Sequence, residues 1–180
     1  MTKTFIDFRF EKESKGVRYH EAGHAAIARS NNRGIRVRAK ITGVDSGITK
    51  LRFPNGTDDL VKFQVSIAGC LSEARALSGR EIDVAPEKIA VLAAQVTTCL
   101  KLGMEAFPVD VCVDGDSMQQ AACNPGDFEW LKGKAVNRHQ LAQAAVLAGN
   151  AIRTPEVADD VDVIARMLLQ FGEYDSNLDV

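Results

Sequence analysis

Apolar residues alternate with polar ones in some stretches of the chain and recur at helical spacing in others. Residues 5–10 alternate in part, which predicts a short strand. Residues 18–30 carry apolar side chains at helical spacing and are rich in alanine, which favours a helix. Asn31, Asn32 and Gly34 follow, and these residue types tolerate the left-handed conformation in which many helices end.

The next two stretches predict an antiparallel hairpin with one buried face. Residues 35–42 alternate strictly between apolar and polar positions, and residues 48–53 alternate again. Residues 43–47 between them have turn chemistry. A local basic cluster accompanies the first stretch, and its period of two predicts one solvated face of a strand. The cluster consists of Arg33, Arg36, Arg38 and Lys40.

The remainder of the chain predicts helices. Residues 60–78 form one, with Asp58 or Asp59 as its cap and Gly79 at its end. A second one begins at Pro86, because proline suits the first helical turn, and runs to about residue 102.

A loop is expected after these helices, followed by two more helices. Residues 108–127 are rich in Asp, Gly and Pro, which predicts a loop with a short helix at 117–122. Helices are predicted at 128–151 and 155–171. The polar tail after Gly172 is expected to be frayed.

Composition and charge are typical of one globular domain. The chain has 180 residues, 46% of them hydrophobic, so we expect a single α+β domain over residues 1–180, mostly helical, with a small antiparallel sheet. The net charge of -2 provides no bulk basic field that would attract nucleic acid or an anionic membrane. No apolar stretch approaches the roughly 20 residues that a membrane span needs. The N-terminus lacks a signal peptide, so a cytoplasmic protein is expected.

His20-Glu21-Ala22-Gly23-His24 matches the pattern H-E-x-x-H on the first predicted helix. Positions i and i+4 share one helix face, so both imidazoles can bind one metal ion. Zinc prefers such nitrogen ligands and lowers the pKa of a bound water towards about 7. Glu21 can take the proton of that water and pass it to the leaving nitrogen. The alternative to a metal site is a surface helix that carries two histidines by chance. Two of the chain's three histidines fall within this five-residue pattern, which favours the metal site.

A catalytic zinc site needs a third protein ligand and an open fourth position. The metzincin pattern is excluded, because Ile27 and Ser30 stand where it requires a glycine and a third histidine. His139, the remaining histidine, is expected to be a surface or packing residue of a late helix. An acidic third ligand is therefore predicted. The candidates are Glu73, Asp83 and Glu87.

Residues 19–25 (YHEAGHA) resemble the zinc helix of the peptidase domain of the FtsH family, the ATP-dependent zinc metalloproteases. A strand hairpin follows the zinc helix in both. Residues 67–74 are similar to the family's helix with a Gly-Gly-Arg-x-Ala-Glu-Glu run, and Glu73 falls on its first glutamate. The resemblance covers about residues 17–105, whereas the C-terminal part, about 106–172, matches only as helices.

This resemblance implies a zincin-like fold with Zn2+ as cofactor and orders the candidates for the third ligand. The family places an aspartate ligand in the first turn of the next helix. Counting on from Glu73 without a gap puts Glu87 there, just after Pro86. Asp83 takes that place if the loop is shifted. Glu73 is the other alternative, either as a ligand or as a partner that orients a histidine. The order of preference is Glu87, Glu73, Asp83.

The implied activity is that of a zinc metalloendopeptidase acting on flexible or unfolded polypeptides. The family's ATPase domain and membrane anchor have no counterpart in these 180 residues. A stand-alone peptidase domain is expected to cut flexible chains or to work with a separate unfoldase or ATPase, and an oligomer is left open. The alternative is a catalytically silent, peptidase-like binding or regulatory protein with a structural zinc.

Overall fold

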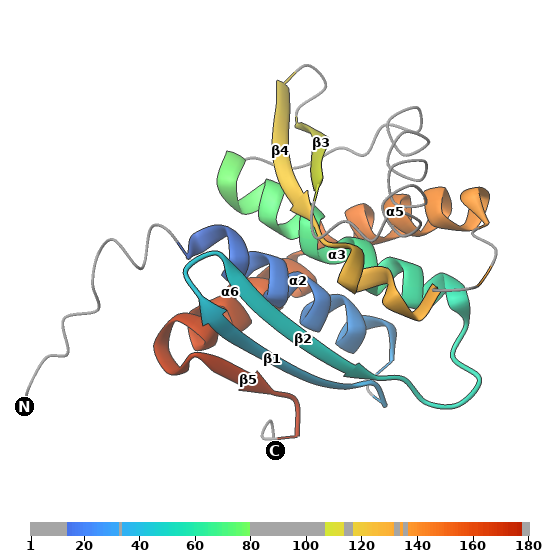
Figure 1. Cartoon of the computed structure of the whole chain (residues 1–180), viewed down its shortest axis with the longest axis horizontal. Coiled ribbons are helices and arrows are strands. Elements are labelled where there is room, and N and C mark those ends of the chain that lie inside the picture. Colours follow the sequence, from blue (N-terminus) through green and yellow to red (C-terminus); the bar gives the residue numbers. More distant parts are fainter. Residues whose placement is uncertain are drawn as a thin grey trace, which may run out of the picture.

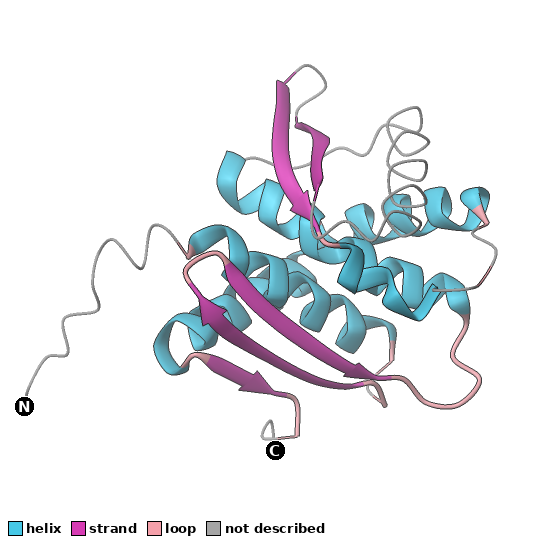
Figure 2. Ribbon diagram, viewed as in Figure 1, coloured by secondary structure: helices cyan, strands magenta, loops and turns pink. Residues whose placement is uncertain are grey.

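The described part of the chain combines helices with two small antiparallel sheets (Figures 1 and 2). None of the described helices is long and apolar enough to cross a lipid bilayer. The predicted strand at 5–10 and the predicted helix at 86–102 lie outside the described residues. The computed structural model describes residues 14–32, 34–79, 107–113, 117–131, 134 and 137–177.

Helices α2 (Lys15–Asn31) and α3 (Asp59–Ser78) pack along one another at the centre of the molecule (Figure 1). They approach closely at Gly23, where a Cβ atom would lie only 2.5 Å from the carbonyl oxygen of Ala68 on α3. Glycine is therefore needed at this crossing of the two helices.

Both helices confirm predicted helices, but only α3 ends in the way that the sequence predicts. The Asp58 carboxylate accepts a hydrogen bond from the backbone N–H of Leu60, and Gly79 closes α3 with the predicted left-handed conformation at φ 67°. The left-handed stop predicted after α2 is wrong, because Asn32 is extended at φ -159°. Its backbone N–H still donates to the carbonyl of Ala28, so the last turn is satisfied without a left-handed residue.

Strands β1 (Arg36–Gly43) and β2 (Ser46–Arg52) confirm the predicted hairpin. A third strand, β5 (Glu173–Asp175), pairs antiparallel with the other edge of β1, which gives the strand order β2-β1-β5. The frayed tail predicted after Gly172 is therefore wrong. Gly172, at φ 74°, turns the chain back onto the sheet, and Tyr174 is buried against the core.

The loop predicted at 108–127, with its short helix, is also wrong. Strands β3 (Phe107–Val113) and β4 (Ser117–Cys123) form a second antiparallel hairpin there. Val109, Val111 and Val113 alternate with other residues, and this period of two is the strand signal. The glutamines and alanines of β4 favour a helix on their own, but pairing with β3 overrides that local preference.

The C-terminal helices complete the core. The 3₁₀ helix η1 (Pro125–Leu131) takes the first residues of the helix predicted at 128–151, and α5 (Arg138–Ile152) begins later, capped by Asn137. The last predicted helix is confirmed as α6 (Pro155–Phe171). Buried alanine, isoleucine and leucine side chains from the four α-helices form one core cluster with the inward side chains of β1.

Candidate metal centre

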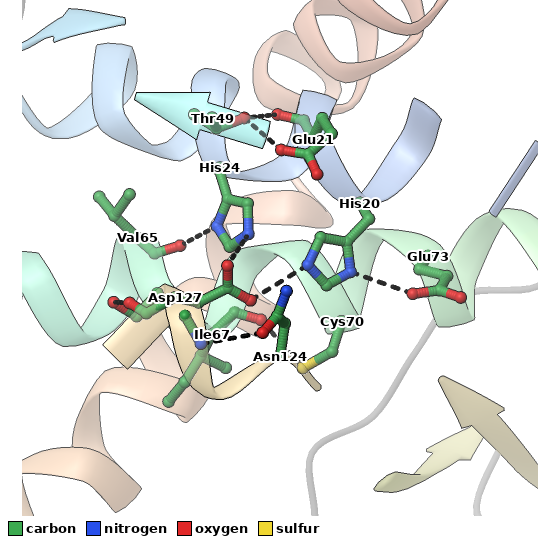
Figure 3. Close-up of polar contacts among 12 residues, drawn as sticks. His20, Glu21, His24, Thr49, Val65, Ile67, Cys70, Glu73, Asn124 and Asp127 are labelled. Carbon is green, nitrogen blue, oxygen red and sulfur yellow. Dashed lines mark hydrogen bonds and ion pairs between the residues drawn. The ribbon is translucent and has the colours of Figure 1, made fainter. Parts of the chain in front are cut away.

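His20 and His24 lie one turn apart on α2 and point to the same place (Figure 3). Both are buried, with exposed fractions of 7% and 2%, and their ring centroids are 4.8 Å apart. A Cβ atom on Gly69 of α3 would lie 2.6 Å from His20 Nε2 and 2.4 Å from His24 Nε2. The missing side chain of Gly69 therefore leaves room for both Nε2 atoms.

Asp127, in the first turn of η1, brings a carboxylate to these two nitrogen atoms. Its Oδ2 lies 3.2 Å from His20 Nε2 and its Oδ1 lies 3.5 Å from His24 Nε2. Each of the three residues offers one ligand atom, and these three atoms all lie within 4.8 Å of one another. Asp127 was not among the ligands predicted from the sequence. Its signal is an acidic residue directly after the turn at Asn124, whose side chain accepts a hydrogen bond from the backbone N–H of Gly126.

The other ring nitrogens show which atoms are left for a metal ion. His20 Nδ1 lies 3.0 Å from a Glu73 carboxylate oxygen, and His24 Nδ1 lies 2.6 Å from the carbonyl oxygen of Val65. Because both partners only accept, each neutral ring carries its proton on Nδ1 and turns the Nε2 lone pair towards Asp127.

The three converging groups are thus all acceptors, and they need a cation between them. His24 Nε2 is buried and has no hydrogen-bond partner within the described residues. Its 3.5 Å separation from Asp127 is too long for a good hydrogen bond. Protons can fill such a site, and so can one metal ion. Two imidazole nitrogens and one carboxylate are a donor set that suits zinc with one position left open.

The charges around the two imidazoles favour a cation. Burial lowers the pKa of His20, but its hydrogen bonds to Asp127 and Glu73 outweigh burial and hold that pKa well above its usual value. Burial likewise lowers the pKa of His24, and the Asp127 charge raises it by more. Burial raises the pKa of Asp127, yet the two imidazoles hold it far below its usual range. A divalent cation would benefit from the same negative charge and would displace the protons.

Two contacts hold Asp127 in place. The Ser66 hydroxyl on α3 donates to the backbone carbonyl of Asp127 at 2.5 Å and accepts from the indole N–H of Trp130 at 3.0 Å. Phe128 and Leu131 bury their side chains in the core. The short helix is thus held on α3 next to the carboxylate.

Glu21 lies on the side of the centre that faces β2 (Figure 3). It is only 6% exposed, and its Oε2 accepts a hydrogen bond from the Thr49 hydroxyl at 2.5 Å. Gly47 makes room for this side chain, because a Cβ there would lie 2.6 Å from Glu21 Cγ. The Glu21 charge raises the pKa of both imidazoles, so the carboxylate acts on the centre without contacting the imidazole nitrogens.

The structure places only some of the predicted site residues. Glu73 lies at His20 Nδ1, away from the converging Nε2 atoms, which is the position of an orienting partner. Asp83 and Glu87 lie outside the described residues. His139 is exposed on α5, which is one of the two positions expected for it.

We expect Glu73→Ala to weaken zinc binding about 10–100-fold, the cost of removing a partner that orients a metal-binding histidine. Competition with a zinc-chelating dye measures the change. Glu156→Ala, on the exposed first turn of α6, is the matched control. An unchanged zinc affinity in the Glu73 variant would contradict this role.

We expect Gly69→Ala to abolish zinc binding and to lower the free energy of unfolding by about 1–3 kcal/mol, the usual cost of overpacking. The new methyl group collides with both Nε2 atoms. Zinc titration and urea unfolding measure the two effects. Gly34→Ala adds the same methyl group at an exposed position, and equal results for both variants would show that Gly69 has no special part.

The centre thus brings His20, Glu21, His24 and Glu73 together and adds Asp127. A scan of the chain against protein-family models found no match, and a search of curated proteins found none either.

Proposed function

We propose that this chain is a zinc-dependent metalloendopeptidase with a zincin-like, FtsH-type fold that hydrolyses flexible or unfolded polypeptides. One observation carries the proposal: two imidazole Nε2 atoms and one carboxylate converge in a buried centre, with a second carboxylate close by. Zinc, when bound, supplies a coordinated water of lowered pKa and polarises a carbonyl group.

Metal binding, orientation of a histidine and proton transfer are assigned to different residues. His20, His24 and Asp127 would hold the ion, and Glu73 keeps the ring of His20 in its tautomer. Glu21 would accept a proton from the attacking water as a general base, and then pass it to the leaving nitrogen as a general acid. The hydrogen bond from Thr49 to Oε2 fixes the carboxylate and leaves Oε1 for the proton.

A polypeptide substrate is supported by the position of β2. Among the strands that the structure describes, β2 is at the edge of its sheet, and its Thr49 and Gly47 contact Glu21. Strand edges present unpaired backbone groups that can pair with an extended chain. An edge strand beside the proton-transfer residue favours a polypeptide over a small amide. Folded substrates would need a separate unfoldase.

The alternative is a silent binding or regulatory protein with a structural zinc. The burial of both imidazoles favours it, because structural zinc sites are closed by four protein ligands. Within the described residues, however, only three ligand groups converge, since Glu73 contacts the far side of His20. Three ligands are the number typical of a catalytic site.

Incubation of the zinc-loaded chain with unfolded casein tests the proposal. Casein is expected to be cut, a chelator to stop the cleavage, and added zinc to restore it. A tightly folded protein in the same tube should stay intact. Bound zinc without any cleavage of casein or of a peptide library would favour the silent alternative, and a chain that binds no zinc would exclude both.

A further inference from the structure

The solvent face of the β1–β2 hairpin is strongly basic. Its register places Arg36 directly opposite Arg52 and Arg38 directly opposite Lys50. Like charges that face each other across two strands are destabilising. The chain as a whole has a net charge of -2, so this concentration of positive charge is local. The exposed basic residues of the face are Arg36, Arg38, Lys40, Lys50 and Arg52.

One edge of this sheet already carries an acidic strand. In β5, Glu173 stands opposite Lys40 and Asp175 stands opposite Arg38, so opposite charges face each other across the ladder. Glu173 also forms an ion pair with Arg38 at 3.3 Å. Tyr174, between the two acids, turns inward and is buried. An acidic–apolar–acidic strand thus matches the basic face and the core at the same time.

The other edge, along β2, repeats the basic half of this arrangement without a partner strand in the described part of the chain. Lys50 and Arg52 point to solvent, whereas Thr49 and Leu51 turn inward and are half-buried. Thr49 is also the residue that binds the Glu21 carboxylate. A strand added here would turn every second side chain towards the two cations and the others towards the side of the metal centre.

We propose that the outer edge of β2 binds an extended polypeptide segment with acidic residues at alternate positions, in the manner of β5 at the opposite edge. Strand pairing supplies the backbone hydrogen bonds, and the two cations select the acids. That such segments are the preferred substrates rests on the proposed function; their binding does not.

Binding to the Glu21→Gln chain tests this without turnover. Fluorescent peptides of alternating Glu and Val are compared, by anisotropy, with matched peptides in which Gln or Lys replaces Glu. We expect the Glu peptide to bind about two- to thirtyfold tighter than the Gln peptide, which is the combined effect of two opposite-charge cross-strand pairs. Added salt should weaken this preference.

Charge reversal at Lys50 and Arg52 to Glu should invert the preference, so that the Lys peptide binds best. Reversal of the exposed Arg153 and Arg166 to Glu changes the net charge equally, and it should leave the preference unchanged. Should the Lys50 and Arg52 variant fail to fold, the pair of Gln substitutions takes its place and should remove the preference.

N-methylation of alternate peptide amides distinguishes strand pairing from plain charge attraction. Methyl groups on one set of alternate amides should abolish binding, and those on the other set should not. Equal binding of the three peptides, or equal effects of both methylation patterns, would overturn the inference. If casein is cut but the charge preference is missing, only this inference fails. If the acidic peptide binds but wild-type chain cuts nothing, only the proposed function fails.

Discussion

His24→Ala is expected to abolish zinc binding, from about one ion per chain to none, because three protein ligands are the usual minimum for a catalytic zinc site. Its Nε2 is buried and has no hydrogen-bond partner among the residues that the structure describes, and its Nδ1 is already bound to a backbone carbonyl. The loss should exceed the roughly 10–100-fold that an orienting partner contributes. Elemental analysis of the purified chain measures the zinc content.

A thermal measurement on the same variant gives a second readout. Zinc should raise the Tm of the wild-type chain, since a ligand present at 100 times its Kd stabilises the folded state by about 2.7 kcal/mol. The Tm of the His24 variant should not respond to zinc. His139→Ala, on the exposed face of α5, is the control and should behave like the wild type. A His24 variant that keeps both its zinc and its Tm response would rule out this centre.

Glu21→Gln is expected to lower the rate of casein cleavage by about 10²–10⁴-fold, the usual contribution of a positioned general base. Glutamine can still accept the hydrogen bond from Thr49, so the side chain should keep its place. It cannot take up a proton, however. The zinc content and the Tm should therefore stay at their wild-type values while the rate falls.

The comparison with Glu129→Gln separates this effect from a general loss of negative charge. Glu129 is an exposed acid on η1, close to Asp127 in sequence, and its substitution should leave the cleavage rate unchanged. A Glu21 variant that cleaves at the wild-type rate would assign the proton transfer to another group. A variant that loses its zinc as well would show that Glu21 supports the metal rather than the reaction.

Elements that depend on local signals could be predicted from the sequence. The histidine motif, the β1–β2 hairpin and the start of α6 at Pro155 each follow from spacing or turn chemistry within a few residues. Long-range pairing could not be predicted in this way. Strand β4 has a helix-favouring composition, and β5 is three residues long, so both depend on partner strands distant in the sequence.

The centre shows the same division. The spacing of His20 and His24 reveals their shared face, but 107 residues separate His20 from Asp127. No periodic pattern spans that distance, and the turn before Asp127 has the composition of an ordinary loop. Glu73 could be placed beside a histidine through the resemblance. The packing of η1 on α3 was needed to find the third carboxylate.

The separation of His20 and Asp127 along the sequence also has a consequence for folding. An ion held by both would tie the first described helix to a short helix far along the chain, closing a loop of 107 residues. A covalent cross-link over about 100 residues reduces the entropy of the unfolded chain by an amount worth about 4.7 kcal/mol. The ion would thus act as a reversible cross-link, and a chain without zinc would lose conformational stability as well as activity.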